Sequence, residues 1–123
     1  MGGGAVGVEG GVSAAEDRLI ADRTATQQLI ASLSGDWDGV VEASAQAAVD
    51  DEHDPEGATI AFERARIQSS LERARAHLID IDEALRRLGD GTYGLCERCG
   101  GPVGAARLEA RPTARTCITC AAA

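Results

Sequence analysis

Four cysteines carry the clearest chemistry in this sequence, and they are the only cysteines in the chain. They form two Cys-x-x-Cys pairs, Cys96 with Cys99 and Cys117 with Cys120, separated by seventeen residues. One such pair places two thiolates on a single ion without straining the short loop between them, and two pairs complete a tetrahedron. Glycines flank the first pair, where tight turns favour residues without a Cβ. The spacing therefore predicts a Zn²⁺ site.

Two disulfides, a redox-active pair and unpaired buried thiols are the alternative interpretations of these cysteines. The paired spacing, together with the absence of any sign of secretion, favours zinc. Four thiolates leave no coordination position for water, so the metal is expected to be structural rather than catalytic. His53 and His77 lie far from the cysteines in the sequence, and we expect both to be solvated surface residues.

The composition limits both the core and the partners. The chain has 123 residues with one Trp, one Tyr and one Phe, too few aromatic side chains for a large globular core. Its net charge is −8, and all twelve basic residues are arginine. An acidic chain is poorly suited to bind a phosphate backbone, so no direct sequence-specific DNA binding is expected. A mildly basic patch near the cysteines suits a protein partner as well as a nucleic acid: Arg98, Arg107, Arg111 and Arg115.

The first half of the chain predicts a tail and a long helix. Residues 1–12 are glycine-rich and almost uncharged, and we expect a disordered tail. Ser13 opens a capping box with Glu16, which is typical of a helix start. Gly35 and Gly39 are expected to kink or briefly break this helix. Its apolar seam is expected to contain Leu19, Thr26, Ile30, Leu33, Trp37, Val40 and Ala47.

A second long helix follows a turn. Pro55 disfavours helical geometry at Asp54 and is itself suited to the first helical position, with Asp54 as N-cap. Gly89 is expected to end this helix. Its heptad seam is broken only at Arg64 and comprises Ile60, Ile67, Leu71, Ala74, Leu78, Ile81, Leu85 and Leu88.

These patterns predict an all-α fold: a long antiparallel coiled-coil hairpin over residues 13–90, followed by a four-cysteine zinc-finger lobe over residues 91–123. The tip at residues 50–57 holds five carboxylates in seven residues. A polar solvated turn accounts for such a tip in part. Five mutually repelling acids also indicate a stalk that delivers negative charge to a basic or metal-containing pocket.

The finger segments Gly91–Gly100, Arg107–Pro112 and Cys117–Cys120, together with the hairpin and acidic tip, resemble the DksA/TraR zinc-finger family. The resemblance implies a bacterial transcription regulator that binds RNA polymerase without needing DNA. It implies that the hairpin enters the secondary channel while the lobe, with its arginines, rests on the channel rim. Asp51 and Asp54 match the aspartates of the family's tip pattern, whereas Glu56 stands in place of its small residue.

The resemblance also marks a difference at the C-terminus. Long family members continue after the last cysteine into a basic helix that helps to hold guanosine tetraphosphate. This sequence ends at Ala121-Ala122-Ala123, so that ligand is not assigned.

Two other functions remain open from the residues. One is a helper resembling transcript-cleavage factors, whose acidic hairpin enters the same channel and helps to hold a second Mg²⁺. The other is a zinc-finger adaptor that binds nucleic acid or protein through the arginines. An independent enzyme is not expected, because the chain offers no nucleophile–base pair and no open metal position.

The N-terminal residues and the lack of long apolar runs predict where in the cell the protein is found. No apolar run approaches the length of a membrane span, and no signal peptide is visible. The expected location is the cytoplasm, where reduced thiols favour zinc over disulfides.

Overall fold

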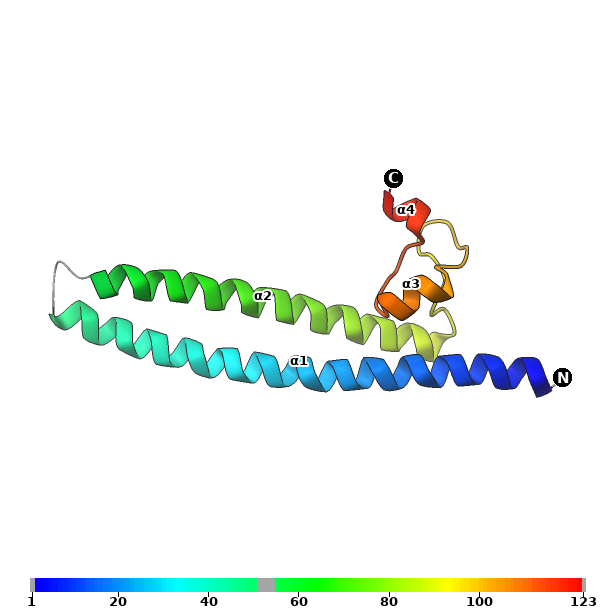
Figure 1. The fold of residues 1–123 in the computed structure, drawn as a ribbon, viewed down its shortest axis with the longest axis horizontal. Helices are drawn as coiled ribbons and strands as arrows, with labels where there is room; N and C mark the ends of the chain where they lie inside the picture. The colour runs from blue at the N-terminus through cyan, green and yellow to red at the C-terminus, as the bar shows by residue number, and fades with distance from the viewer. Residues whose placement is uncertain (1, 51–54, 123) are drawn as a thin grey trace. The chain divides into compact units, whose positions relative to one another are not determined.

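The fold is helical. A computed structural model describes residues 2–50 and 55–122, with side chains described for residues 14–43, 45 and 58–122. Its helices are α1 (Gly2–Asp50), α2 (Pro55–Asp90), α3 (Ala105–Ala110) and α4 (Ile118–Ala122) (Figure 1). Among the described residues, extended pairing is limited to an isolated antiparallel bridge between Leu95 and Pro102. The predicted all-α class, with a helical hairpin and a C-terminal cysteine lobe, is confirmed.

The chain divides into two compact units that cut across both long helices. Unit 1 comprises Met1–Thr24 and Ile79–Ala123, and unit 2 comprises Ala25–Leu78. The sequence suggested a division at residue 91, between hairpin and lobe. That boundary stays a prediction. In unit 1 the base of the hairpin packs with the start of the lobe, because residues of α2 and Tyr93 share one apolar cluster, described below.

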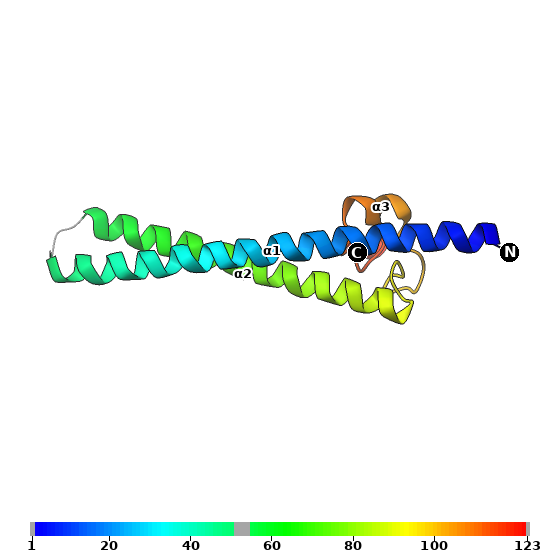
Figure 2. The same cartoon turned by 90° about the horizontal axis from the view of Figure 1, so that it is seen from below.

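Unit 2 is an antiparallel pair formed by the later part of α1 and the earlier part of α2 (Figures 1 and 2). Its core is Leu33, Ile67 and Leu71, with Ile30, Trp37 and Val40 packed against it. All six belong to the predicted seams, so the heptad pattern located this core correctly. The seam position occupied by Arg64 is also accounted for, because its guanidinium carbon lies 5.3 Å from the centroid of the Trp37 ring.

Unit 1 has a smaller core. Leu19 of α1 packs with Ile81 and Ala84 of α2, and Leu85, Leu88 and Tyr93 pack against this group. Arg23 of α1 pairs with Asp82 of α2 at 2.6 Å beside it. The seam predicted Leu19 and Ile81, but it did not predict Ala84, which is fully buried. Tyr93 lies beyond the end of α2, so this cluster joins the helices to the start of the lobe.

Helix α2 begins at the predicted residue but ends later than predicted. Its first residue is Pro55, as predicted, while the proposed cap Asp54 lies outside the described residues. The helix runs past Gly89, contrary to expectation, and Gly91 adopts a φ of +79° directly after Asp90. The amides of Gly91 and Thr92 donate to the carbonyls of Leu88 and Arg87, the paired bonds of a Schellman motif. Gly89 and Gly91 could each have ended the helix, and Gly91 is the one that takes the left-handed conformation.

Helix α1 is longer and more continuous than expected. It begins at Gly2 rather than at Ser13, so the residues expected to form a tail are helical. Extending an existing helix costs far less than nucleating one, so a capping box does not by itself fix the first residue. Gly35 and Gly39 interrupt neither the helix assignment nor the packing face. Both glycines are exposed, and an added Cβ would meet nothing within 4 Å. Each glycine therefore weakens the helix only through its lower helix propensity compared with alanine.

Candidate metal centre

The four cysteine sulfur atoms converge. Their ligand atoms all lie within 4.8 Å of one another, and the sulfurs of Cys99 and Cys117 are 3.9 Å apart. A tetrahedral ion with Zn–S bonds of about 2.3 Å requires sulfurs about 3.8 Å apart. None of these cysteines forms a disulfide. In the part of the chain that the structure describes, no other group of three or more potential ligands gathers in this way.

The first pair lies on a tight backbone turn. The amide of Cys96 donates to the carbonyl of Gly101 at 2.7 Å, and the amide of Gly100 donates to the carbonyl of Cys96 at 2.9 Å. Gly100 has a φ of +74° and Gly94 a φ of +87°, conformations that an L side chain rarely adopts. A Cβ on Gly94 would also lie 3.4 Å from Leu108 of α3. The predicted need for glycine around this pair thus has a direct geometric basis.

The second pair flanks and enters α4. Cys117 directly precedes this short helix, and its carbonyl accepts the amide of Ala121 at 2.9 Å. Two contacts join the pairs: the amide of Glu97 donates to the carbonyl of Arg115, and Arg98 donates to the carbonyl of Cys120 at 3.3 Å. The two residues between Cys96 and Cys99 therefore bind the segment that carries the second pair.

The thiols of the site differ in their tendency to ionise. A hydrogen bond from the backbone amide of Cys99 is the main cause that lowers the pKa of Cys96 to about 6. The pKa of Cys117 is also lowered, chiefly by the backbone amide of Cys120. Hydrogen bonding with Cys117 and Cys96 raises the pKa of Cys120 to about 12. Backbone amides already stabilise thiolates here, and thiolate is the form in which cysteine binds a metal.

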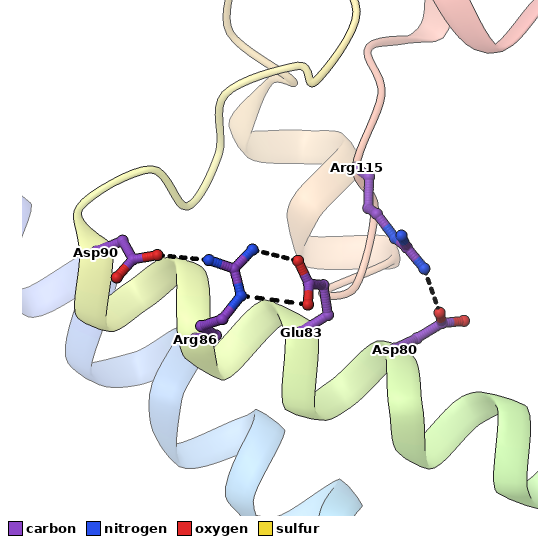
Figure 3. A network of polar contacts seen from close by, with 5 residues as sticks. All are labelled: Asp80, Glu83, Arg86, Asp90 and Arg115. Carbon is purple, nitrogen blue, oxygen red and sulfur yellow. Dashed lines mark hydrogen bonds and ion pairs between the residues drawn. The ribbon is translucent and has the colours of Figure 1, made fainter.

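Hydrogen bonds within the lobe and from the lobe to α1 and α2 hold unit 1 together. Arg115, two residues before Cys117, donates to Asp80 of α2 at 2.6 Å (Figure 3). The Tyr93 hydroxyl donates to the carbonyl of Pro112 at 2.9 Å. Arg18 of α1 donates to the carbonyl of Glu109 at 3.1 Å, at the C-terminal end of α3. The cysteine site is therefore built on the base of the hairpin.

A second ion-pair group lies along the same stretch of α2. Arg86 pairs with Glu83 and, at 2.6 Å, with Asp90 (Figure 3). These pairs follow the three- and four-residue spacing of helix neighbours, and because they are exposed to solvent they add little to stability.

The predicted basic patch is partly engaged inside the lobe. Arg107 donates to the carbonyl of Thr116 at 2.8 Å in a half-buried position, and Arg115 is paired with Asp80. Arg98 and Arg111 are exposed. The sequence could not distinguish the engaged arginines, Arg107 and Arg115, from the exposed ones. The difference depends on which carbonyls and carboxylates lie near each arginine in the folded lobe.

The predicted tip residues fall at the limit of the described structure. Asp51 and Asp54 lie outside the described residues, as does His53. Glu56 is in the first turn of α2, but its side chain is not described. Their role therefore stays a prediction.

Two arginines important to unit 1 were missed from the sequence. Arg87 is 7 % exposed, and its Nε and Nη2 atoms are buried with no hydrogen-bond partner among the described residues. Arg18 reaches the lobe across the chain. Arginine at a helix surface is normally solvated, so nothing in the local pattern distinguished either residue.

The described helices include none with the length and apolar character needed to cross a membrane.

Comparison with known proteins places this site in a family. The family described as "Prokaryotic dksA/traR C4-type zinc finger" matches residues 91–123. A protein of Caulobacter vibrioides named "RNA polymerase-binding transcription factor DksA" is 54 % identical over 52 residues, covering 42 % of this chain and 37 % of the relative. The protein of the same name from Escherichia coli is 45 % identical over 49 residues, covering 40 % and 32 %. The matched segments thus span only about a third of these curated relatives.

A solved structure extends the comparison over nearly the whole chain. The structure titled "Structure of transcription factor DksA2 from Pseudomonas aeruginosa" matches with a TM-score of 0.77 and 31 % sequence identity. It covers 93 % of this chain and 82 % of the solved one. The match includes both long helices and the cysteine lobe, and the prediction of structural zinc at Cys96, Cys99, Cys117 and Cys120 is supported by geometry and family together. The chain belongs to the DksA/TraR family of four-cysteine zinc-finger proteins.

Proposed function

We propose that this protein is a bacterial transcription regulator that binds RNA polymerase directly and is not itself an enzyme. The observation that carries the proposal is the match to a transcription factor over 93 % of this chain, hairpin included. A zinc finger alone would be compatible with many partners. The solved transcription factor shares with this chain both the finger and the two long helices, and that combination supports a common function. The proposal places the protein with the polymerase in the bacterial cytoplasm.

The acidic tip is the proposed acting part. Asp51, Asp54 and Glu56 would enter the polymerase's secondary channel and act near its active centre, changing the lifetime of promoter complexes. Concentrated carboxylates interact strongly with basic groups or with Mg²⁺ once they are removed from bulk water. Glu56 is larger and more acidic than the family's small residue, so the strength of the effect is expected to differ from that of family members with the small residue. Guanosine tetraphosphate is not assigned as a ligand.

The lobe is the proposed rim contact. Arg111 is exposed and is the better candidate, and Arg98 is also exposed although it donates to the carbonyl of Cys120. Arg107 and Arg115 are proposed to act by holding the lobe in shape through Thr116 and Asp80.

The test compares two double variants in a transcription assay with purified polymerase. Asp51→Asn with Asp54→Asn should remove the effect on promoter-complex lifetime while leaving binding to core polymerase within about threefold of wild type. The matched control is Asp36→Asn with Asp38→Asn, which removes two exposed carboxylates from α1 outside the tip. The control variant should behave as wild type. Equal activity of the tip variant and wild type would refute the role of the tip.

A backtracked transcription complex supplies a second readout. No shortening of the RNA is expected, because the proposal has the tip carboxylates change the lifetime of promoter complexes and assigns them no part in holding a catalytic Mg²⁺. Mg²⁺-dependent RNA cleavage on addition of this protein would instead support a cleavage helper.

A further inference from the structure

Arg115 links the cysteine site to a long helix. Its backbone carbonyl accepts the amide of Glu97 at 2.9 Å, and Glu97 lies between the two cysteines of the first pair. Its side chain donates to Asp80 of α2 at 2.6 Å (Figure 3). Two residues further along the chain is Cys117, the first cysteine of the second pair. One residue thus contacts the turn of the first pair, precedes the second pair and binds α2.

Apolar packing cannot fix the position of the second pair. Cys117 and Cys120 are half-buried, and the short helix α4 that follows Cys117 has no buried residue. Within residues 91–122, the buried side chains are those of Cys96 and Val103. A helix of 5 residues is also too short to be stable on its own. The position of the second pair therefore depends on directed polar contacts.

Three arginines supply such contacts to the segment that carries the second pair. Arg98 and Arg107 each donate to a backbone carbonyl of this segment, at 3.3 Å and 2.8 Å. Both arginines belong to the lobe, so their bonds hold the segment only relative to the rest of the lobe. Arg115 differs, because its partner Asp80 lies in α2, a helix of 36 residues. This ion pair ties the second cysteine pair to a long element with a core of its own.

The ion pairs of Arg86 provide an internal comparison on the same stretch of α2. Arg86 pairs with Glu83 and Asp90, and all three residues lie on that one helix (Figure 3). Asp80 and Arg115 are 35 positions apart, and their side chains are 41 % and 40 % exposed. At such exposure the pair adds little to stability by itself. Its effect is therefore expected on the position of the cysteine segment.

We propose that Asp80 raises the affinity of the four cysteines for Zn²⁺, although it is not itself a ligand. By holding Arg115, Asp80 keeps Cys117 close to the position in which it binds the ion. Ligands that are ordered in advance lose less conformational freedom on binding, and residues that orient metal ligands typically change metal affinity by about 10–100-fold. Asp80 and Arg115 are thus positioning residues. The metal-binding unit is the lobe together with the base of α2, and both belong to compact unit 1.

The test titrates the full-length zinc-loaded protein with a chromophoric chelator and measures the dissociation constant for Zn²⁺. Asp80→Asn removes the charge while keeping the size, and it should raise this constant about tenfold. Arg115→Gln should raise it by a similar factor, because the backbone contact with Glu97 remains and only the pair is lost. The double variant should be weaker than either single variant by less than about twofold, because both changes break one interaction.

Two controls separate the positioning of the ligands from folding. Arg86→Gln removes two ion pairs from the same stretch of α2, and its dissociation constant should stay within about twofold of wild type. Urea unfolding of the metal-free protein, followed by Trp37 fluorescence, should give the same hairpin stability in every variant. Trp37 lies in unit 2, whereas all the changed residues lie in unit 1.

Four results would overturn the proposal. Dissociation constants within about twofold of wild type in both single variants of the pair would show that the second cysteine pair needs no anchor on α2. An equal loss in Arg86→Gln would assign the effect to any ion pair of this helix. Losses that multiply in the double variant would mean that Asp80 and Arg115 act separately. Tighter binding by Asp80→Asn would mean that Arg115 acts on the thiolates through its charge and needs no partner.

Discussion

Removal of zinc should unfold the lobe while leaving most of the helix intact. Within residues 91–122, all of which the structure describes, only Cys96 and Val103 are buried. A lobe with one buried valine and one buried cysteine has no apolar core able to hold it. Structural zinc, which supplies about 10–16 kcal/mol, is the largest single stabilising interaction available to it.

The loss should be confined because the long helices have cores of their own. Helices α3 and α4 contain 6 and 5 residues, against 49 and 36 in α1 and α2. Far-ultraviolet circular dichroism should therefore lose only about a tenth of its helical signal on chelation. The single tryptophan, Trp37, lies in unit 2, and its fluorescence should stay unchanged.

Limited trypsin digestion followed by mass spectrometry locates the change. Cleavage after Arg98, Arg107 and Arg115 should accelerate about tenfold or more in the metal-free protein, since local opening exposes these bonds. Cleavage after Arg73 and Arg75 of α2 serves as the internal control and should keep its rate. Added Zn²⁺ should restore protection.

Two results would refute this reasoning. Unchanged trypsin resistance of the lobe after complete metal removal would mean that its backbone bonds suffice without zinc. Loss of half the helical signal would mean that the helices depend on the lobe. A Cys99→Ser variant, purified with and without added zinc, repeats the test without a chelator and should resemble the metal-free protein.

Two further predictions concern single positions. Gly35→Ala should raise the free energy of unfolding by about 0.5–1 kcal/mol, whereas Gly91→Ala should lower it by about 1–2 kcal/mol. An added Cβ meets nothing within 4 Å at either glycine, so the φ of +79° at Gly91 sets the sign; urea titration measures both, and a shared sign would contradict the explanation. Burial raises the pKa of Tyr93 above its ordinary value of 10.0, so the contribution of its neutral hydroxyl to stability is complete below pH 10 and declines as the pH rises further. Absorbance at 295 nm follows this single tyrosine, and a native-state midpoint at or below pH 10 would contradict the assignment.

The sequence predicted those features that depend on local spacing. The cysteine pairs are three residues apart in each turn, and their convergence requires only that the two turns meet. The start of α2 at Pro55 follows from the fixed φ of one ring. The seam of unit 2 follows from heptad periodicity, since every member of its core recurs at three or four residues.

The features that escaped prediction depend on contacts between distant segments. Gly89 and Gly91 are equally able to end a helix, and the choice is made where Tyr93 packs against the cluster of Leu19, Ile81 and Ala84. Arg18 and Glu109 are 91 positions apart, and Arg115 and Asp80 are 35 apart. No periodicity connects such residues. The unpaired buried atoms of Arg87 likewise reflect the packing of unit 1 rather than any helical pattern.

Three arginines in or beside the lobe have a structural role that lysine would fill less well. Arg18, Arg98 and Arg107 each donate to a backbone carbonyl that no helix or strand satisfies. A small lobe with little burial leaves such carbonyls without regular partners, and a planar guanidinium with several directed N–H groups reaches them better than a compact ammonium. Arginines near a zinc site therefore cannot be counted as partner-binding residues from charge alone. Their positions relative to free carbonyls must be known first, and this distinction leaves the exposed Arg111 as a stronger surface candidate than the half-buried Arg107.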